Sequence, residues 1–154
     1  MEHFRTEVEA PEFPFFIDHE SRVVMLGSCF AENVGGRLQQ NKIETLINPF
    51  GILFNPFSIM NALERMLNNR PYSNEDLMQV GEQWVSLDHH GSFNHTNADT
   101  CVEGINASLT NGAEALKKAD TLFITLGSAW LYEHTASGRT VANCHKIPNK
   151  EFRK

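Results

Sequence analysis

The sequence RVVMLGSCFA, residues 22–31, carries the pattern from which the fold of this 154-residue chain can be predicted. Its first half is a short apolar run ended by Gly27, which is typical of a strand buried on both faces of a parallel sheet. After the glycine, apolar side chains from Ala31 to Leu38 follow helical spacing. Residues 121–127 form a second apolar run that also ends in a glycine. The pattern predicts two similar strands, the first followed by a sharp turn and a helix.

Strand and helix patterns alternate along the rest of the chain. They predict a strand at 44–48, an amphipathic helix with Ile59, Met60, Leu63, Met66 and Leu67 on one stripe, a short helix from Asn74, a short strand at 84–87, a long helix capped by Asn97, and a hairpin formed by 129–134 and 139–144. Asn111-Gly112 favours a break in the long helix. This order indicates an α/β fold with a three-layer, doubly wound parallel sheet that is incomplete, followed by a C-terminal hairpin. Ligands bind such sheets at the carboxyl ends of the strands, where Gly27 and Gly127 would both lie.

Composition and charge argue against several classes of protein. The net charge of −6 disfavours a nucleic-acid partner, and no window approaches the roughly 20 apolar residues of a membrane helix. The N-terminus carries acids and prolines where a secretory signal would be basic and then apolar, so we expect a cytoplasmic location. Residues 1–20 are rich in proline and phenylalanine, and we expect an extended arm lying across the surface of a domain formed by 21–154.

The cysteines and histidines give little indication of a metal site. Cys29, Cys101 and Cys144 are an odd number of widely spaced thiols, which suits neither a disulfide framework nor a zinc site. Residues 88–95 hold three histidines and a carboxylate, but their spacing fits no ligand template. We expect this stretch to be a solvated loop rather than a metal site. No metal and no cofactor are therefore predicted.

The turn after the first strand is the best candidate for chemistry. Ser28 or Cys29 could act there as an exposed nucleophile, with backbone N–H groups at the helix start stabilising an oxyanion. Thiols at helix N-termini also have lowered pKa values in general. In the competing interpretation Gly27 makes the turn, Ser28 caps the helix and Cys29 is a small packing residue. Local spacing leaves both interpretations open.

Three strings of the sequence resemble motifs of the GSCFA family. They are GSCFA at 27–31, NPFGILFNP at 48–56, and LGSAW at 126–130 followed by VANCHK at 141–146. This family is distantly similar to the SGNH/GDSL ester hydrolases, which use a serine after the first strand, oxyanion donors from a glycine and an asparagine, and a C-terminal Asp-x-x-His. The resemblance implies that 21–154 is the N-terminal portion of such a domain, with an SGNH- or flavodoxin-like sheet.

The resemblance assigns candidate roles to individual positions. A gapless match puts Cys29 in the nucleophile position, and a shift by one residue puts Ser28 there instead. Ala129 stands where those hydrolases have the oxyanion asparagine, and either Asn55 or Asn143 could replace it in space. With no Asp-x-x-His before the last residue, His145 is the candidate base. The positions implied for oxyanion and substrate binding are Gly27, Gly51, Asn55, His90, Gly127, Ser128 and Asn143.

The function implied by the resemblance is an SGNH-type ester hydrolase or acyltransferase. Its substrate would be an acyl or acetyl ester of a small molecule or glycan. The alternative is a non-catalytic ligand-binding or truncated remnant domain that keeps the fold without the catalytic Asp-x-x-His. A third hypothesis is a thiol-dependent protein that uses Cys29 for redox or adduct chemistry.

Overall fold

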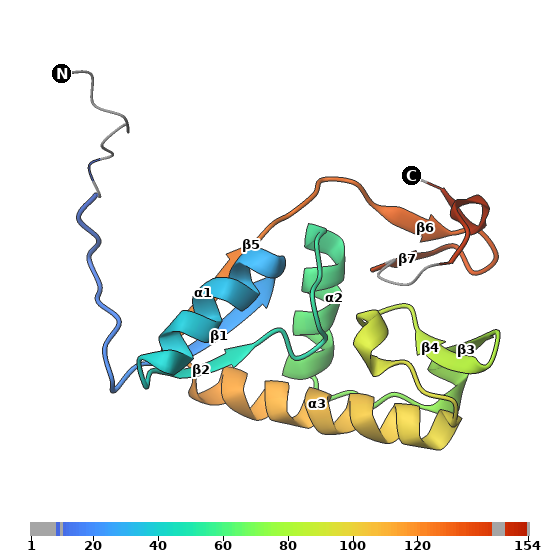
Figure 1. Cartoon of the computed structure of the whole chain (residues 1–154), viewed down its shortest axis with the longest axis horizontal. Helices are drawn as coiled ribbons and strands as arrows, with labels where there is room; N and C mark the ends of the chain where they lie inside the picture. The colour runs from blue at the N-terminus through green and yellow to red at the C-terminus, as the bar shows by residue number, and fades with distance from the viewer. Residues whose placement is uncertain (1–8, 10, 143–146, 154) are drawn as a thin grey trace.

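A three-stranded parallel sheet with the order β2-β1-β5 lies beside α1, at the side of the protein nearest the N-terminal arm (Figure 1). The structure is a computed structural model that describes residues 9, 11–142 and 147–153. The strands are β1 at Arg22–Gly27, β2 at Glu44–Ile47 and β5 at Thr121–Thr125. Val24 pairs with Leu46 on one side and with Leu122 on the other. The first apolar run is therefore the central strand, as its composition predicts.

Helices cover both faces of this sheet. They are α1 at Cys29–Gln40, α2 at Pro56–Leu67 and α3 at Ala98–Lys118. Val23 and Met25 of β1 pack with Ala31 of α1, whereas Val24 and Leu26 join a cluster formed with α2 and α3. Alternate residues of β1 thus face opposite layers, which is why all four residues from Val23 to Leu26 are apolar and buried. The chain is an α/β protein with a parallel sheet between helices.

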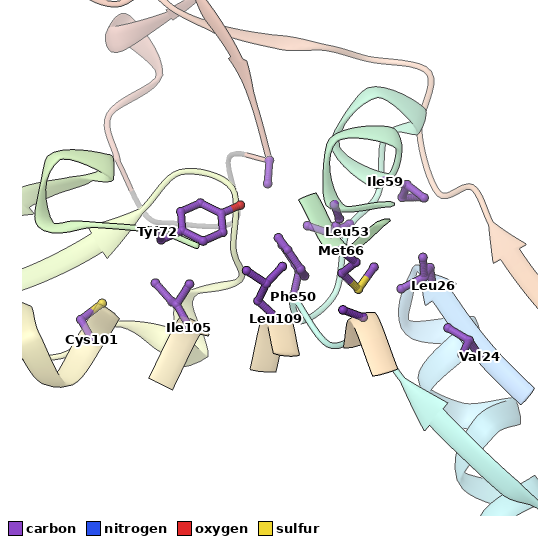
Figure 2. Close-up of a cluster of buried hydrophobic side chains, with 13 residues drawn as sticks. Val24, Leu26, Phe50, Leu53, Ile59, Met66, Tyr72, Cys101, Ile105 and Leu109 are labelled. Carbon is purple, nitrogen blue, oxygen red and sulfur yellow. The ribbon is translucent and has the colours of Figure 1, made fainter. Parts of the chain in front are cut away.

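The larger core cluster extends from β1 across α2 to the N-terminal half of α3 (Figure 2). Val24 and Leu26 lie at one end of the cluster, and Tyr72, Cys101 and Ile105 lie at the other. Phe50 and Leu53, from the loop before α2, fill the middle, and each is 1% exposed. Burial of apolar surface stabilises a fold by about 25 cal/mol per Å². This continuous cluster therefore ties the sheet to the C-terminal half of the described chain.

Outside the parallel sheet, the described residues form two small antiparallel sheets and three short 3₁₀ helices. The elements are β3 at Leu77–Val80 paired with β4 at Gln83–Ser86, β6 at Tyr132–His134 between β7 at Arg139–Val141 and β8 at Phe152–Arg153, and the 3₁₀ helices Asn74–Asp76, Gly91–Phe93 and Asn149–Glu151. The hairpin predicted near the C-terminus is confirmed by β6 and β7, whereas β3 was not expected. In the described part of the chain, no helix has the length and apolarity needed to cross a bilayer.

The predicted break at Asn111-Gly112 is wrong, because α3 continues through both residues. Gly112 is buried, and a Cβ added to it would lie 2.3 Å from Sδ of Met66 on α2 and 3.3 Å from Cβ of Pro49. The absence of a side chain lets α3 lie close to α2. This packing offsets the cost of glycine in a helix, which is about 1 kcal/mol relative to alanine.

The N-terminal arm does not pack its aromatic side chains as expected. Its phenylalanines Phe13, Phe15 and Phe16 are 61%, 48% and 90% exposed. The segment runs away from the sheet in Figure 1, and the rings of Phe13 and Phe15 contact each other with centroids 6.0 Å apart. Ile17, in contrast, packs against the cluster of Val23, Met25 and Ala31. Pro11 and Pro14 favour an extended backbone, and in the described part of the arm Phe13, Phe15 and Phe16 stay exposed.

Two glycines of α3 make a matched test of this packing. We expect Gly112→Ala to lower the free energy of unfolding by about 1–3 kcal/mol, because the added methyl group overpacks the contact with Met66. Gly104→Ala should raise it by about 0.5–1 kcal/mol, since Gly104 lies in the same helix with no atom within 4 Å of an added Cβ. Urea denaturation followed by circular dichroism measures both. Equal stabilisation by the two substitutions would contradict the packing role of Gly112.

Candidate functional site

The backbone at the end of β1 is held in a conformation that favours glycine. Gly27 has a φ of +131°, and a Cβ there would lie 2.0 Å from the carbonyl oxygen of Thr125 on β5. The Gly27 N–H donates to Oδ1 of Asn48 at 2.8 Å, and the Gly27 carbonyl accepts from Leu53 N at 2.9 Å. The turn is thus fixed by β5 on one side and by the loop after β2 on the other.

Ser28 is the N-cap of α1 and is only 8% exposed. Its Oγ accepts from Phe30 N at 3.3 Å and shares a hydrogen bond of 3.1 Å with Oγ1 of Thr125. Its N–H donates to the carbonyl oxygen of Thr125 at 3.2 Å and to Oγ1 at 3.1 Å. The hydroxyl therefore has a structural role at the start of the helix, as one of the two sequence interpretations proposed.

Cys29 is the first residue of α1 and is exposed. The backbone N–H groups in the first turn of a helix, together with the helix dipole, favour a negatively charged group. Ala31 N donates to the Ser28 carbonyl at 2.9 Å, whereas no described residue accepts the Cys29 N–H. The thiol and an N–H donor thus lie together at the positive end of α1.

Gly127 and Ser128 lie next to this turn, on the segment that follows β5. Both N–H groups donate to the carbonyl oxygen of Phe54, at 2.9 and 3.0 Å. A Cβ built on Gly127 would be 3.2 Å from Cβ of Ser28 and 2.7 Å from Cδ1 of Phe54. We call this meeting of residues 27–29, 48–55 and 125–128 the β1–β5 junction. The two glycine-ended strands are adjacent and parallel, and their carboxyl ends meet here.

A common pocket at the β1–β5 junction stays a prediction. One cavity of about 180 Å³ lies beside α2 and is lined partly by Arg65, Asp88 and Arg139. Another, of about 270 Å³, lies between the start of β1, β2 and α3. Neither of these two cavities is lined by residues of the junction.

Three further candidates lie at the loop after β2. Gly51 and Asn55 belong to this loop, and His90 contacts it from the segment after β4. Asn55 is 2% exposed and caps α2, with its Oδ1 accepting from Ser58 N at 2.8 Å. Gly51 has a φ of +76°, donates its N–H to the Asn48 carbonyl at 2.7 Å, and has no room for a Cβ beside His90. His90 N donates to the Phe50 carbonyl at 2.9 Å. These contacts anchor the loop.

The histidine-rich stretch 88–95 is not the solvated loop that we expected, because His89 is 0% exposed. Its ring stacks on Phe50 with centroids 4.3 Å apart, and Tyr72 and Phe93 approach it edge-on. Its Nδ1 shares a hydrogen bond of 2.8 Å with Oγ of Ser86. His89 is thus part of the core, and over the described ranges no group of three or more His, Cys, Asp and Glu side chains comes together.

Two candidates, Asn143 and His145, lie outside the described residues, as does Cys144. The sequence analysis also missed two residues of the junction, Thr125 and Asn48. Thr125 belongs to a predicted strand, but only the register of β1 with β5 puts its hydroxyl beside Ser28. Asn48 begins one of the quoted motifs, yet no sequence pattern indicated that its side chain bonds to Gly27.

A family model described as the GSCFA family matches residues 22–154. No curated protein and no solved structure matches the chain.

The exposure of the two described cysteines predicts different reactivity. We expect Cys29 to be alkylated by iodoacetamide at neutral pH faster than Cys101, with Cys144 between them. Cys101 is 2% exposed, its Sγ donates to the Phe93 carbonyl at 3.2 Å, and burial raises the pKa of its thiol. At neutral pH, a smaller fraction of the Cys101 thiol is therefore ionised than its ordinary pKa would give. Mass spectrometry of partially alkylated native protein measures the order, with urea-denatured protein as the control. Labelling of Cys29 last would show that its thiol is not accessible.

Proposed function

The chain belongs to the GSCFA family, and on this premise we propose that it is an SGNH-type ester hydrolase or acyltransferase acting on an acyl or acetyl ester. The observation that carries the proposal is the exposed Cys29 thiol at the N-terminus of α1. This helix start lies at the carboxyl edge of the parallel sheet, where α/β proteins bind their ligands. Its N–H groups and dipole would stabilise the oxyanion formed during acyl transfer.

We propose Cys29 rather than Ser28 as the nucleophile. The Ser28 hydroxyl is buried and engaged by Phe30 N and Thr125, so attack by Oγ would require both contacts to change. The Cys29 side chain is exposed in the next position. Ser28 would then act as a positioning residue that holds the first turn of α1 in place. The gapless match to the hydrolase opening block supports the same choice.

The reaction would follow the usual two steps of acyl transfer. A base removes the Cys29 proton, Sγ attacks the ester carbonyl carbon, and the carbonyl π electrons move to oxygen. Collapse of this oxyanion breaks the bond to the alcohol oxygen, which takes the proton from the base and leaves an acyl thioester on Cys29. Water deprotonated by the same base attacks the thioester, releasing the carboxylic acid and returning a proton to sulfur. We propose His145 as the base.

Exposed apolar side chains around the β1–β5 junction suit the acyl part of such a substrate. They come from α1, from the loop before α2 and from the segment after β5, namely Phe30, Phe54, Leu126 and Trp130, which are 62%, 41%, 61% and 64% exposed. Large exposed apolar side chains that gather near a polar site are typical of binding surfaces. Binding of an ester with an apolar acyl group would remove part of these four side chains from contact with water.

A non-catalytic ligand-binding domain is the second candidate. Ala129 at the position of the oxyanion asparagine favours it, as does the lack of a hydrogen bond between Ser28 or Cys29 and any histidine of the described residues. Loss of one oxyanion donor costs about 10²–10³ in rate. We therefore expect weak activity at best on simple aryl esters.

The test is p-nitrophenyl acetate hydrolysis combined with intact-mass detection of acetylated protein. We expect slow turnover with one acetyl group on Cys29, and Cys29→Ala should reduce the rate to the uncatalysed background. His145→Asn should slow acetylation at neutral pH and weaken its pH dependence, because the base is lost. Cys101→Ala is the control, since its thiol is buried.

Two results would argue against this assignment. Unchanged turnover after Cys29→Ala, with loss of turnover after Ser28→Ala, would transfer the nucleophile role to Ser28. An inactive and unacetylated wild-type protein would leave the non-catalytic candidate in its place.

A further inference from the structure

β5 is an edge strand of the parallel sheet, and its sequence has no feature that protects the free edge. In the described ranges, β5 pairs with β1 on one side and with no strand on the other. The free N–H and C=O groups of such an edge can pair with a further strand, and proteins commonly prevent this with lysine, proline or a covering segment. Residues 121–132 contain no charged residue and no proline. The β5 edge is therefore open to pairing.

The opposite edge of the same sheet, at β2, carries such protection. The strand begins with Glu44, whose side chain is exposed and charged, and Lys42 lies two positions before it. The Thr45 carbonyl oxygen accepts a hydrogen bond of 2.9 Å from Nε2 of Gln39 on α1, so a side chain occupies that backbone acceptor. The contrast between the two edges indicates that β5 is the edge at which the sheet can be extended.

The helices also leave one face of β5 uncovered. In the register of the two strands, Leu122 lies beside Val24, which is 1% exposed in the cluster with α2 and α3. Leu122 itself is 41% exposed, and Ile124, which lies beside the buried Leu26, is 47% exposed. On the other face Phe123 packs against the cluster at α1. A partner on the β5 edge therefore has to bring apolar side chains to the α2–α3 face.

We propose that the β5 edge pairs with the β5 edge of a second copy of this chain about a twofold axis. A twofold dimer uses the same surface on both copies, and a strand that hydrogen-bonds to its own copy in this way runs antiparallel to it. Pairing centred on Phe123 uses the whole of β5. Leu122 then lies opposite Ile124 of the second copy, on the same face of the sheet. Thr121 lies opposite Thr125, so apolar side chains meet apolar ones and threonine meets threonine.

This self-complementarity selects a second copy as the occupant of the edge. Apolar and threonine pairs directly opposite each other stabilise antiparallel strands, whereas like charges in that position destabilise them. The net charge of −6 makes two copies repel each other on average, so contact is favoured where the surface is uncharged, as it is along β5. The two sheets then join into one with the order β2-β1-β5-β5-β1-β2, and the two β1–β5 junctions lie toward opposite ends of it.

Sedimentation equilibrium over the micromolar concentration range tests the proposal. We expect the wild type to approach the mass of two chains as concentration rises. Ile124→Lys should keep the mass of one chain, because lysine on an edge strand opposes pairing, and its circular dichroism should match the wild type, since Ile124 is half-exposed. Leu67→Lys is the matched control, because Leu67 is an exposed apolar residue of α2, outside β5. It should dimerise like the wild type.

Two results of this experiment overturn the proposal. A wild type that stays monomeric at every concentration leaves the β5 edge to a strand of a different polypeptide. An Ile124→Lys protein that dimerises as well as the wild type shows that the copies meet on another surface.

Hydrogen exchange locates the contact without any substitution. We expect the backbone amides of β5 to exchange more slowly at high protein concentration than at low concentration, because pairing engages the N–H groups of the free edge. The hairpin of β3 and β4 is the internal reference, and its exchange should not change with concentration. A dimer in which the β5 amides exchange equally fast at both concentrations overturns the proposal.

Discussion

The close approach of the Gly27 and Thr125 backbones is the contact on which the rest of the structure depends. No residue with a Cβ fits at Gly27, because that atom would lie 2.0 Å from the Thr125 carbonyl oxygen. The contact joins β1 to β5 at their carboxyl ends and turns the chain directly into α1. β1 is the central strand, and its side chains pack against helices on both faces of the sheet. A side chain that pushed the Gly27 and Thr125 backbones apart would therefore disturb the helix packing on both faces.

The loop between β2 and α2 transmits this constraint to the core. Asn48 and Leu53 bond to the two polar backbone groups of Gly27, while Phe50 and Leu53 are buried in the cluster with α2 and α3. Phe50 also stacks on His89, so the same short loop contacts the segment after β4. The loop is therefore held by polar contacts at the edge of the sheet and by apolar burial behind it.

Sequence patterns predicted most of the fold, because the periodicity of apolar residues is a local property. The two glycine-ended strands, the helix after Ser28 and the hairpin of β6 and β7 were all anticipated in this way. Local reasoning failed where a distant contact decides the outcome. α3 continues through Gly112 because Met66 of α2 packs where a side chain at that position would lie. His89 is buried because its ring stacks on the ring of Phe50.

The sequence by itself determined that a small polar pair, Ser28 and Cys29, follows a buried strand and begins a helix at the carboxyl edge of a parallel sheet. A strand pattern, a glycine and a helix pattern suffice for that inference, since each depends on neighbouring residues only. Tertiary structure alone decided that Ser28 is buried and Cys29 exposed, because Thr125 lies 97 residues from Ser28 and meets it only through the register of β5. It likewise decided the direction of the Asn48 amide, since the Gly27 N–H, 21 residues away, selects its oxygen.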